Sequence, residues 1–285
     1  MDAALPLLLG LFSAITLAIV NTAVKAGTDI LVGRAILSIY AAIMVLPAIF
    51  YLPWPDAATW RWLMIAPLGH WAYTFALVRA LHRGDLSLVF PVMRGTAPVL
   101  TALAAFLFLG EDLSTFSVVG LLIASASLIV FAMPEKTTSD RPLQRSALFW
   151  AAMTACGIAL YNVIDAQGTR AAETPYVFIA WLFVIDVVGI TSVTLMMRGR
   201  RALAKAIVVK WRYGLVAGGL SVASYGAALY GFSISNVAMI SALRETAVVF
   251  AVLMGAKWLK EGVSRRRIGA AVALVAGLVL MQFGG

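Results

Sequence analysis

Two arginines lie inside apolar stretches of this chain, where a charged side chain is costly. Arg94 lies nine residues after Asp85, and Arg244 lies eight residues after Asn236. At 1.5 Å per helical residue, both are expected about 12–14 Å into a hydrocarbon layer about 30 Å thick. An arginine at that depth costs about 2.5–3.5 kcal/mol and usually faces a cavity or a partner. These residues therefore predict a site for an anionic group. The alternative is a structural role, with Arg94 bonded to carbonyls or Arg244 to a carboxylate.

Glu245 follows Arg244 directly in the sequence. Neighbouring residues on a helix point about 100° apart, so these two side chains need not pair with each other. Two arginines and one glutamate at similar depth leave a net positive site, which suits a carboxylate. Because a buried carboxylate is costly in its charged form, Glu245 is expected to hold an ammonium group or accept a coupling proton. The alternative for Glu245 is a salt-bridge strut.

Polar and aromatic side chains on other apolar stretches complete the candidate site. His70 and Tyr73 share a helical face, with Trp71 beside them. Their alternatives are a structural histidine and the aromatic belt found at membrane interfaces. The predicted substrate-binding residues are Arg94, Arg244, Glu245, His70, Tyr73, Trp71, Asn21, Tyr161, Asn162, Ser221 and Tyr225.

Enzymatic, metal and cofactor chemistry is not expected. Two histidines and one cysteine are too few for a zinc or haem site. The chain has no Walker motif and no G-x-S-x-G or His-Glu-x-x-His run. The sequence therefore predicts neither catalytic residues nor a bound cofactor.

The composition is that of a polytopic membrane protein. Hydrophobic residues make up 62% of the 285 residues and charged residues 12%, whereas a soluble domain carries about a quarter charged residues. No basic residue precedes the first apolar run, so we expect a retained first helix rather than a cleaved signal peptide. The predicted spans are Ala4–Val24, Ile30–Tyr51, Trp60–Ala80, Leu86–Leu109, Phe116–Met133, Ser146–Ile164, Tyr176–Met197, Tyr213–Phe232, Val237–Trp258 and Ile268–Phe283.

The chain contains an internal repeat. Residues 94–114 align with residues 244–264, and eight of these 21 positions are identical, among them an arginine, a glutamate and a serine. A polar stretch around residues 134–145 separates five predicted helices from five. We therefore expect repeats at 1–138 and 139–285. Because five is odd, the second repeat enters the membrane inverted, an arrangement found in secondary transporters. The predicted fold is an all-α integral membrane protein of ten transmembrane helices in two inverted-topology five-helix repeats.

Basic residues are distributed unevenly between the two sides of the predicted membrane. One side holds 18 Lys and Arg residues, and the other holds Arg61 and Arg170. The positive-inside rule places both termini on the non-cytoplasmic side. Topology thus explains most of the +9 net charge, and nucleic-acid binding is not expected.

Two smaller patterns concern helix ends and packing. Ser114 and Ser264 are predicted N-caps of the helices that follow them. Small residues recur in the same two helices, at Gly120, Ala124 and Ser127 and at Gly269, Ala273 and Gly277. That spacing favours close helix contact, either within the chain or between protomers.

The repeated motifs resemble those of the drug/metabolite transporter superfamily, specifically its EamA-like members. The resemblance rests on Arg94-Gly95-Thr96-Ala97-Pro98 through Leu109-Gly110-Glu111-Asp112-Leu113-Ser114, on Leu243-Arg244-Glu245-Thr246 through Leu259-Lys260-Glu261, and on Gly33-Arg34. In the second copy Lys260 replaces Gly110 and no proline matches Pro98, so the two halves are expected to be functionally unequal.

The resemblance implies a secondary-active transporter, an exporter of amino acids or similar small metabolites across the inner membrane by alternating access. Its partners would be a small-molecule substrate and the lipid bilayer, with the protein as a monomer or homodimer. The alternatives are a carrier of other organic anions or drug-like cations, and a membrane scaffold or sensor that transports nothing.

Overall fold

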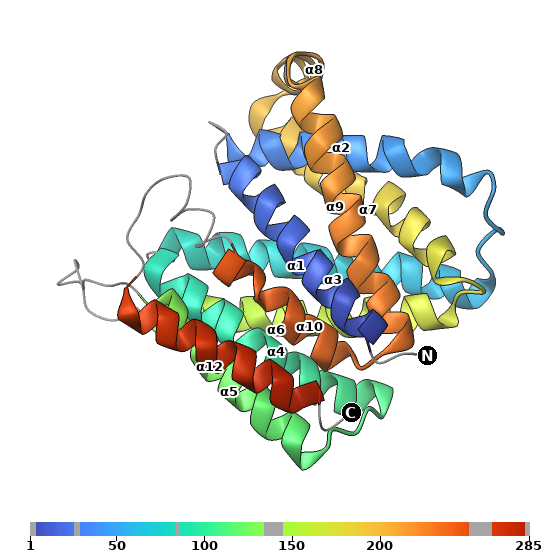
Figure 1. Ribbon diagram of the computed structural model, residues 1–285. Helices are drawn as coiled ribbons and strands as arrows, with labels where there is room; N and C mark the ends of the chain where they lie inside the picture. The colour runs from blue at the N-terminus through green and yellow to red at the C-terminus, as the bar shows by residue number, and fades with distance from the viewer. Residues whose placement is uncertain (1–3, 26–28, 84–85, 134–144, 251–263, 283–285) are drawn as a thin grey trace. The chain divides into compact units, whose positions relative to one another are not determined.

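The computed structural model describes residues 4–25, 29–83, 86–133, 145–250 and 264–282, and its regular elements there are all α-helices (Figure 1). The expectation of an all-α protein is confirmed for these residues. The helices are α1 (Ala4–Lys25), α2 (Ile30–Ile49), α3 (Ala57–Arg83), α4 (Leu86–Leu109), α5 (Thr115–Ala132), α6 (Arg145–Ala171), α7 (Pro175–Arg198), α8 (Arg200–Val209), α9 (Trp211–Ile234), α10 (Val237–Glu245) and α12 (Arg265–Gln282).

Six of the described helices are long and apolar enough to cross a membrane, namely α1, α2, α4, α6, α7 and α9. Shorter α5 contains an apolar stretch at Thr115–Phe131. The chain is therefore a multi-pass membrane protein. The predicted span Val237–Trp258 is described only as far as Phe250, and the motif Leu259-Lys260-Glu261 lies outside the described residues. The count of ten spans stays a prediction.

Helix ends follow the capping chemistry of the sequence. The Ser114 hydroxyl accepts the Ser117 N–H at 3.2 Å at the start of α5, and the Ser264 hydroxyl accepts the Arg267 N–H at 3.4 Å at the start of α12. Both predicted caps are confirmed. By contrast, α6 continues past its expected end at Ile164 to Ala171, because the polar residues there lower hydropathy without breaking the helix.

The structure shows a helix, α8, where the sequence predicted a loop between α7 and α9. Gly199, with φ of 80°, separates it from α7, and an L-residue with a side chain rarely adopts that backbone conformation. The basic residues of this segment led to the prediction of a loop. Alanine, leucine, arginine and lysine are nevertheless all good helix formers. Leu203 is buried and holds α8 against its neighbours.

The chain divides into two compact units, each built from two separate segments of the sequence. Unit 1 comprises Met1–Leu68 and Asp165–Ile234, and unit 2 comprises Gly69–Ile164 and Ser235–Gly285. Two of the three boundaries fall within α3 and α6, and the third follows the end of α9. These units are a division by contact, whereas the expected repeats at 1–138 and 139–285 are a division by sequence, and the latter stays a prediction.

In unit 1, α1 packs against α9, and α2 packs against both α7 and α9. Val45 and Ile49 of α2 meet Ala180 of α7 in a buried apolar cluster. Asp29 caps the start of α2 and forms an ion pair with Arg198 at the end of α7, with 2.7 Å between Nε and Oδ2. The hydrogen bond from Arg198 lowers the pKa of the Asp29 carboxyl below its ordinary value. This pair joins the ends of α2 and α7.

In unit 2, α5 packs closely against α12, and α4 packs against α5 and α10. The α5–α12 contact is close because small residues meet there. A Cβ atom added at Gly277 would lie 2.6 Å from the Gly120 carbonyl oxygen and 2.8 Å from the Ala124 nitrogen. Gly120, Ala124 and Gly277 therefore serve a contact within the chain, whereas a Cβ atom added at Gly269 would meet nothing within 4 Å.

Gly277→Ala is expected to destabilise the protein by about 1–3 kcal/mol, because the added methyl group meets the backbone of α5. Gly269→Ala is the matched control on the same helix, since a Cβ there has nothing within 4 Å. That control should be neutral or stabilising by up to about 1 kcal/mol, from alanine's higher helix propensity. Thermal unfolding of the two purified variants measures the difference, and equal melting temperatures would contradict the close contact.

Candidate functional site

An ion pair between α4 and α10 is the centre of the candidate site in unit 2. The Nη1 atom of Arg94 donates to Oε1 of Glu245 at 3.0 Å and to Oε2 at 3.2 Å. The side chains are 18% and 5% exposed, respectively. The sequence predicted both residues as site residues but did not predict that they pair. A buried pair of this kind is weak evidence for stability by itself, because desolvating two charges offsets much of their attraction.

The backbone differs between the two arginine positions. Helix α4 continues through Arg94 to Leu109, whereas α10 ends at Glu245, where the Thr246 N–H bonds to the Leu243 carbonyl at 3.1 Å. Helical residues resume at 247–250. The expectation of one uninterrupted helix from Val237 is thus corrected. The C-terminal end of α10 carries a partial negative charge beside Glu245, which favours cations there.

Aromatic rings from α3 and α6 flank the ion pair. Tyr161 makes edge-on contacts with His70, at 4.9 Å between ring centroids, and with Tyr73, at 5.5 Å. Tyr161 also lies close enough to Arg94, Arg244 and Glu245 to interact with them electrostatically. The structure therefore brings together His70, Tyr73, Arg94, Tyr161, Arg244 and Glu245, all of which the sequence singled out.

Asn162 forms a second polar contact in unit 2, beside Tyr161 in the sequence. Its Nδ2 atom donates to Oγ1 of Thr101 at 3.3 Å and to Oγ of Ser241 at 3.2 Å, and the residue is 1% exposed. These bonds join α6 to α4 and to α10, the helices that carry Arg94 and Glu245. Asn162 is therefore placed to position the ion-paired helices, a role that hydropathy alone does not reveal.

Four further predicted residues, Trp71, Asn21, Ser221 and Tyr225, take no part in the contacts described above. Trp71 lies in unit 2 and is 43% exposed. Asn21, Ser221 and Tyr225 belong to unit 1, where Asn21 and Ser221 are partly buried. The roles of these four residues in binding stay predictions.

Unit 1 contains a buried carboxylate that the sequence reading overlooked. Asp165 of α6 is 0% exposed and accepts a hydrogen bond from the Tyr225 hydroxyl. Nearby on α9, the Ser224 hydroxyl donates to the Ser13 carbonyl of α1 at 2.8 Å. Asp165 was missed because the expected span ended one residue earlier, at Ile164. The signal that identifies it is its spacing of four residues from Tyr161, within one helical pattern.

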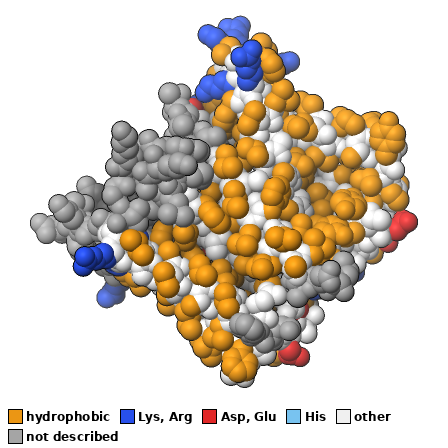
Figure 2. All heavy atoms as spheres, viewed as in Figure 1, with side chains coloured by type: hydrophobic (Ala, Val, Ile, Leu, Met, Phe, Trp, Pro, Cys, Tyr) orange, Lys and Arg blue, Asp and Glu red, His pale blue; other side chains and the backbone are white. Residues whose placement is uncertain are grey.

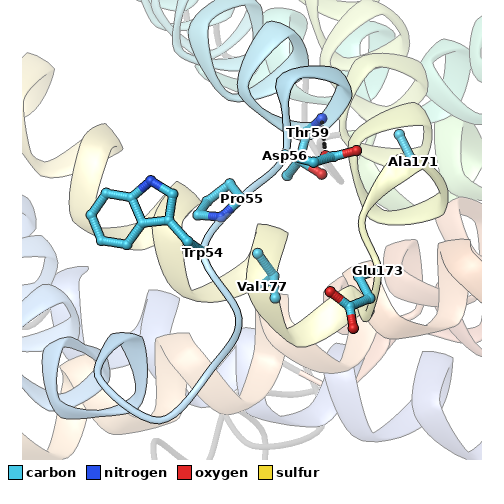
Figure 3. A pocket seen from close by; sticks show the side chains of 7 residues that line it. All are labelled: Trp54, Pro55, Asp56, Thr59, Ala171, Glu173 and Val177. Atoms are coloured by element: carbon cyan, nitrogen blue, oxygen red, sulfur yellow. Dashed lines mark hydrogen bonds between the residues drawn. The ribbon is translucent and has the colours of Figure 1, made fainter.

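A cavity of about 290 Å³ lies at the α2–α3 and α6–α7 connections of unit 1 (Figure 3). Its lining includes the side chains of Trp54, Asp56 and Glu173. The Asp56 carboxylate accepts the Thr59 N–H at 2.8 Å, and hydrogen bonds from Thr59 lower the pKa of that carboxyl. Asp56 thus caps the start of α3. Among the described residues no group of three or more His, Cys, Asp or Glu side chains is placed to hold a metal ion.

Comparisons with known proteins agree with this architecture. Residues 145–283 match the family described as the EamA-like transporter family. A WAT1-related chloroplastic protein of Arabidopsis thaliana is 25% identical over 216 residues, which cover 73% of this chain and 51% of that protein. The chain thus spans about half the length of this curated relative. A protein of known crystal structure shares the fold, with a TM-score of 0.73 and 18% identity over 98% of this chain and 95% of that one.

Proposed function

We propose that this chain, whose residues 145–283 match the EamA-like transporter family, is a secondary-active carrier of small carboxylate-bearing metabolites, amino acids among them. Members of this family are transporters rather than enzymes. The observation that carries the proposal is the buried Arg94–Glu245 ion pair. Secondary transporters bind substrates at such charged positions near the middle of the membrane.

Substrate recognition follows from an exchange of partners at Arg94. A guanidinium group binds a substrate carboxylate in the same geometry in which it binds the carboxylate of Glu245. A substrate that takes over Arg94 therefore replaces an existing contact, so the arginine is never left as an uncompensated charge. The adjacent rings of Tyr73 and Tyr161 offer contact area for the rest of a small molecule.

Glu245 loses its counter-ion when the substrate occupies Arg94. An unpaired carboxylate in a site that is 5% exposed is costly, and taking up a proton removes that cost. Proton binding and carboxylate binding then favour each other, which is proton-coupled transport. In that case proton and substrate move across the membrane together, so export of the kind implied by the family resemblance would be driven by the substrate's own concentration gradient. A zwitterionic substrate offers a second outcome, in which its ammonium group replaces the proton at Glu245.

The carrier is proposed to work by alternating access in the inner membrane, with ten helices arranged as two inverted repeats. This arrangement is supported by the sequence repeat and by the uneven distribution of Lys and Arg. In this arrangement the helices that carry Arg94 and Arg244 enter from opposite sides, and the two arginines are expected at similar depth.

A reporter fused after Gly285 is expected to be active on the non-cytoplasmic side, because 18 basic residues lie on the opposite side of the predicted membrane and two on the same side. A fusion at Pro134, between the predicted fifth span and the next, should report the cytoplasm and serves as the control. Cytoplasmic activity from both fusions would contradict the inverted repeat.

Transport by the purified chain in vesicles tests the proposal directly. The panel compares radiolabelled amino acids, dicarboxylates and organic cations, each with and without an imposed pH gradient. Uptake of carboxylate-bearing compounds that unlabelled substrate competes away supports the proposal. Uptake of cations alone would identify a carrier of drug-like cations, and no uptake of any compound would favour a scaffold.

A further inference from the structure

Helix α8 concentrates positive charge at the connection between two spans. Residues 198–212 contain six basic residues and no acidic one. The six are Arg198, Arg200, Arg201, Lys205, Lys210 and Arg212. In the part of the chain that the structure describes, Arg198 is ion-paired with Asp29. In the face that Figure 2 presents, Lys and Arg side chains gather over α8.

One side of α8 faces the protein. Leu203 is buried, Ile207 is partly buried, and the Tyr40 hydroxyl donates to the Ile207 carbonyl at 3.2 Å. These contacts fix the helix against α2. Arg200, Arg201 and Lys205 are exposed, and helical spacing places Arg201 and Lys205 on the side opposite Leu203. The contacts therefore determine which charges α8 presents outward.

Helix α8 and the residues on either side of it also expose apolar side chains. Val208 is 72% exposed and Val209 is 68% exposed, while Met196 just before the helix is 87% exposed. Trp211 follows the helix and is 47% exposed. The guanidinium carbon of Arg212 lies 5.3 Å from the centroid of the Trp211 ring. Exposed valine, methionine and tryptophan side chains favour an apolar environment, and the six basic residues beside them favour an anionic one. The surface of a membrane that contains anionic lipids offers both, whereas water does not.

The position of α8 places it at a membrane surface. Both α7 and α9 qualify as membrane-spanning helices, and only Gly199 and Lys210 connect them to α8. Figure 1 shows α8 at the end of α9, turned away from the direction of that helix. A ten-residue helix is about 15 Å long, so α8 must remain near the ends of the two spans.

We propose that α8 is an interfacial helix that binds anionic phospholipid headgroups. Arg200, Arg201 and Lys205 contact the phosphates with their charged ends, while Val208, Val209 and Trp211 enter the boundary between headgroups and acyl chains. Long basic side chains suit this position because their methylene stems lie along apolar surface while the charge remains in the polar layer. The positive-inside rule requires only the charges, and it accounts neither for an ordered helix nor for the exposed valines.

Quenching of tryptophan fluorescence by brominated lipids tests this binding in the full chain. The protein is reconstituted in phosphatidylcholine bilayers that contain either brominated phosphatidylglycerol or brominated phosphatidylcholine. The contribution of Trp211 is the difference between the parent chain and its Trp211→Phe variant. We expect Trp211 quenching to favour phosphatidylglycerol roughly tenfold or more, because three basic side chains act together. Added salt should reduce this preference by screening.

Two matched variants locate the effect on α8. Arg200→Gln/Arg201→Gln/Lys205→Gln should lose the preference, whereas Arg200→Lys/Arg201→Lys/Lys205→Arg keeps every charge and should retain it. The salt titration of the parent chain tests the proposal even if the neutralised variant does not fold. Equal quenching by the two lipids in the parent chain would overturn the proposal. A preference that survives neutralisation would also overturn it. Displacement of brominated phosphatidylglycerol by soluble polyglutamate at low molar ratio would assign the surface to an acidic protein segment instead.

Discussion

Arg94→Gln is expected to raise the substrate concentration for half-maximal transport at least tenfold, because it removes a charge-assisted contact worth about 1.5–3 kcal/mol. The same change leaves Glu245 buried without its Arg94 partner, so the variant should also lose about 3 kcal/mol of stability. We expect Arg244→Gln to weaken transport in the same direction. Uptake in vesicles and thermal unfolding measure the two effects separately.

The double variant Arg94→Gln/Glu245→Gln distinguishes binding from structure. With neither charge present, no uncompensated buried charge remains, so stability should largely return, while substrate affinity should remain low. Arg79→Gln is the control for loss of an arginine elsewhere, since Arg79 is exposed on α3 beside Phe75. If the double variant recovers both stability and affinity, the ion pair is a structural strut and the substrate binds at another position.

Glu245→Gln is expected to retain substrate exchange but to lose accumulation driven by a pH gradient. Glutamine has nearly the shape of a protonated glutamate and cannot release the proton, so the step that couples proton and substrate is removed. Two vesicle assays separate the outcomes, one for exchange of labelled against unlabelled substrate and one for gradient-driven uptake. Loss of exchange together with accumulation would indicate that Glu245 binds the substrate's ammonium group.

Asp165→Asn is the matched control for this experiment. Asp165 is also buried and also accepts a hydrogen bond, from Tyr225, but it belongs to unit 1. It should keep gradient-driven accumulation if Glu245 carries the coupling proton. Accumulation that is lost in Asp165→Asn and preserved in Glu245→Gln would place the coupling at Asp165 and refute the proposed role of Glu245.

Helical structure and burial depth follow from local properties of the sequence. Helix α4 begins and ends at the predicted residues, Leu86 and Leu109, because hydropathy changes sharply at both ends. The Ser114 cap is likewise set by neighbouring residues alone. The sequence also marked Arg94 and Glu245 as unusual, since a charge in an apolar run is costly wherever its partner lies.

Predictions from local sequence properties were wrong for segments whose composition is polar although their backbone is helical, and for one interrupted helix. The basic residues of α8 lower its hydropathy although they favour a helix, so the segment was expected to be a loop. Asp165 was excluded from α6 for the same reason, because a charged residue reads as a boundary even where the helix continues. The interruption of α10 after Glu245 has no glycine or proline to mark it.

Only the tertiary structure decided which charged and polar groups meet. Arg94 and Glu245 are 151 residues apart, and Asn162 reaches Thr101 and Ser241 across 61 and 79 residues. Such contacts depend on which faces of α4, α6 and α10 pack together, and helical periodicity in a mostly apolar sequence does not specify those faces. Repetition within the sequence predicted two aligned arginines in functionally unequal halves, but it did not say how their surroundings differ. The structure shows that Arg94 lies on a continuous helix, whereas Arg244 lies next to the residue that ends α10.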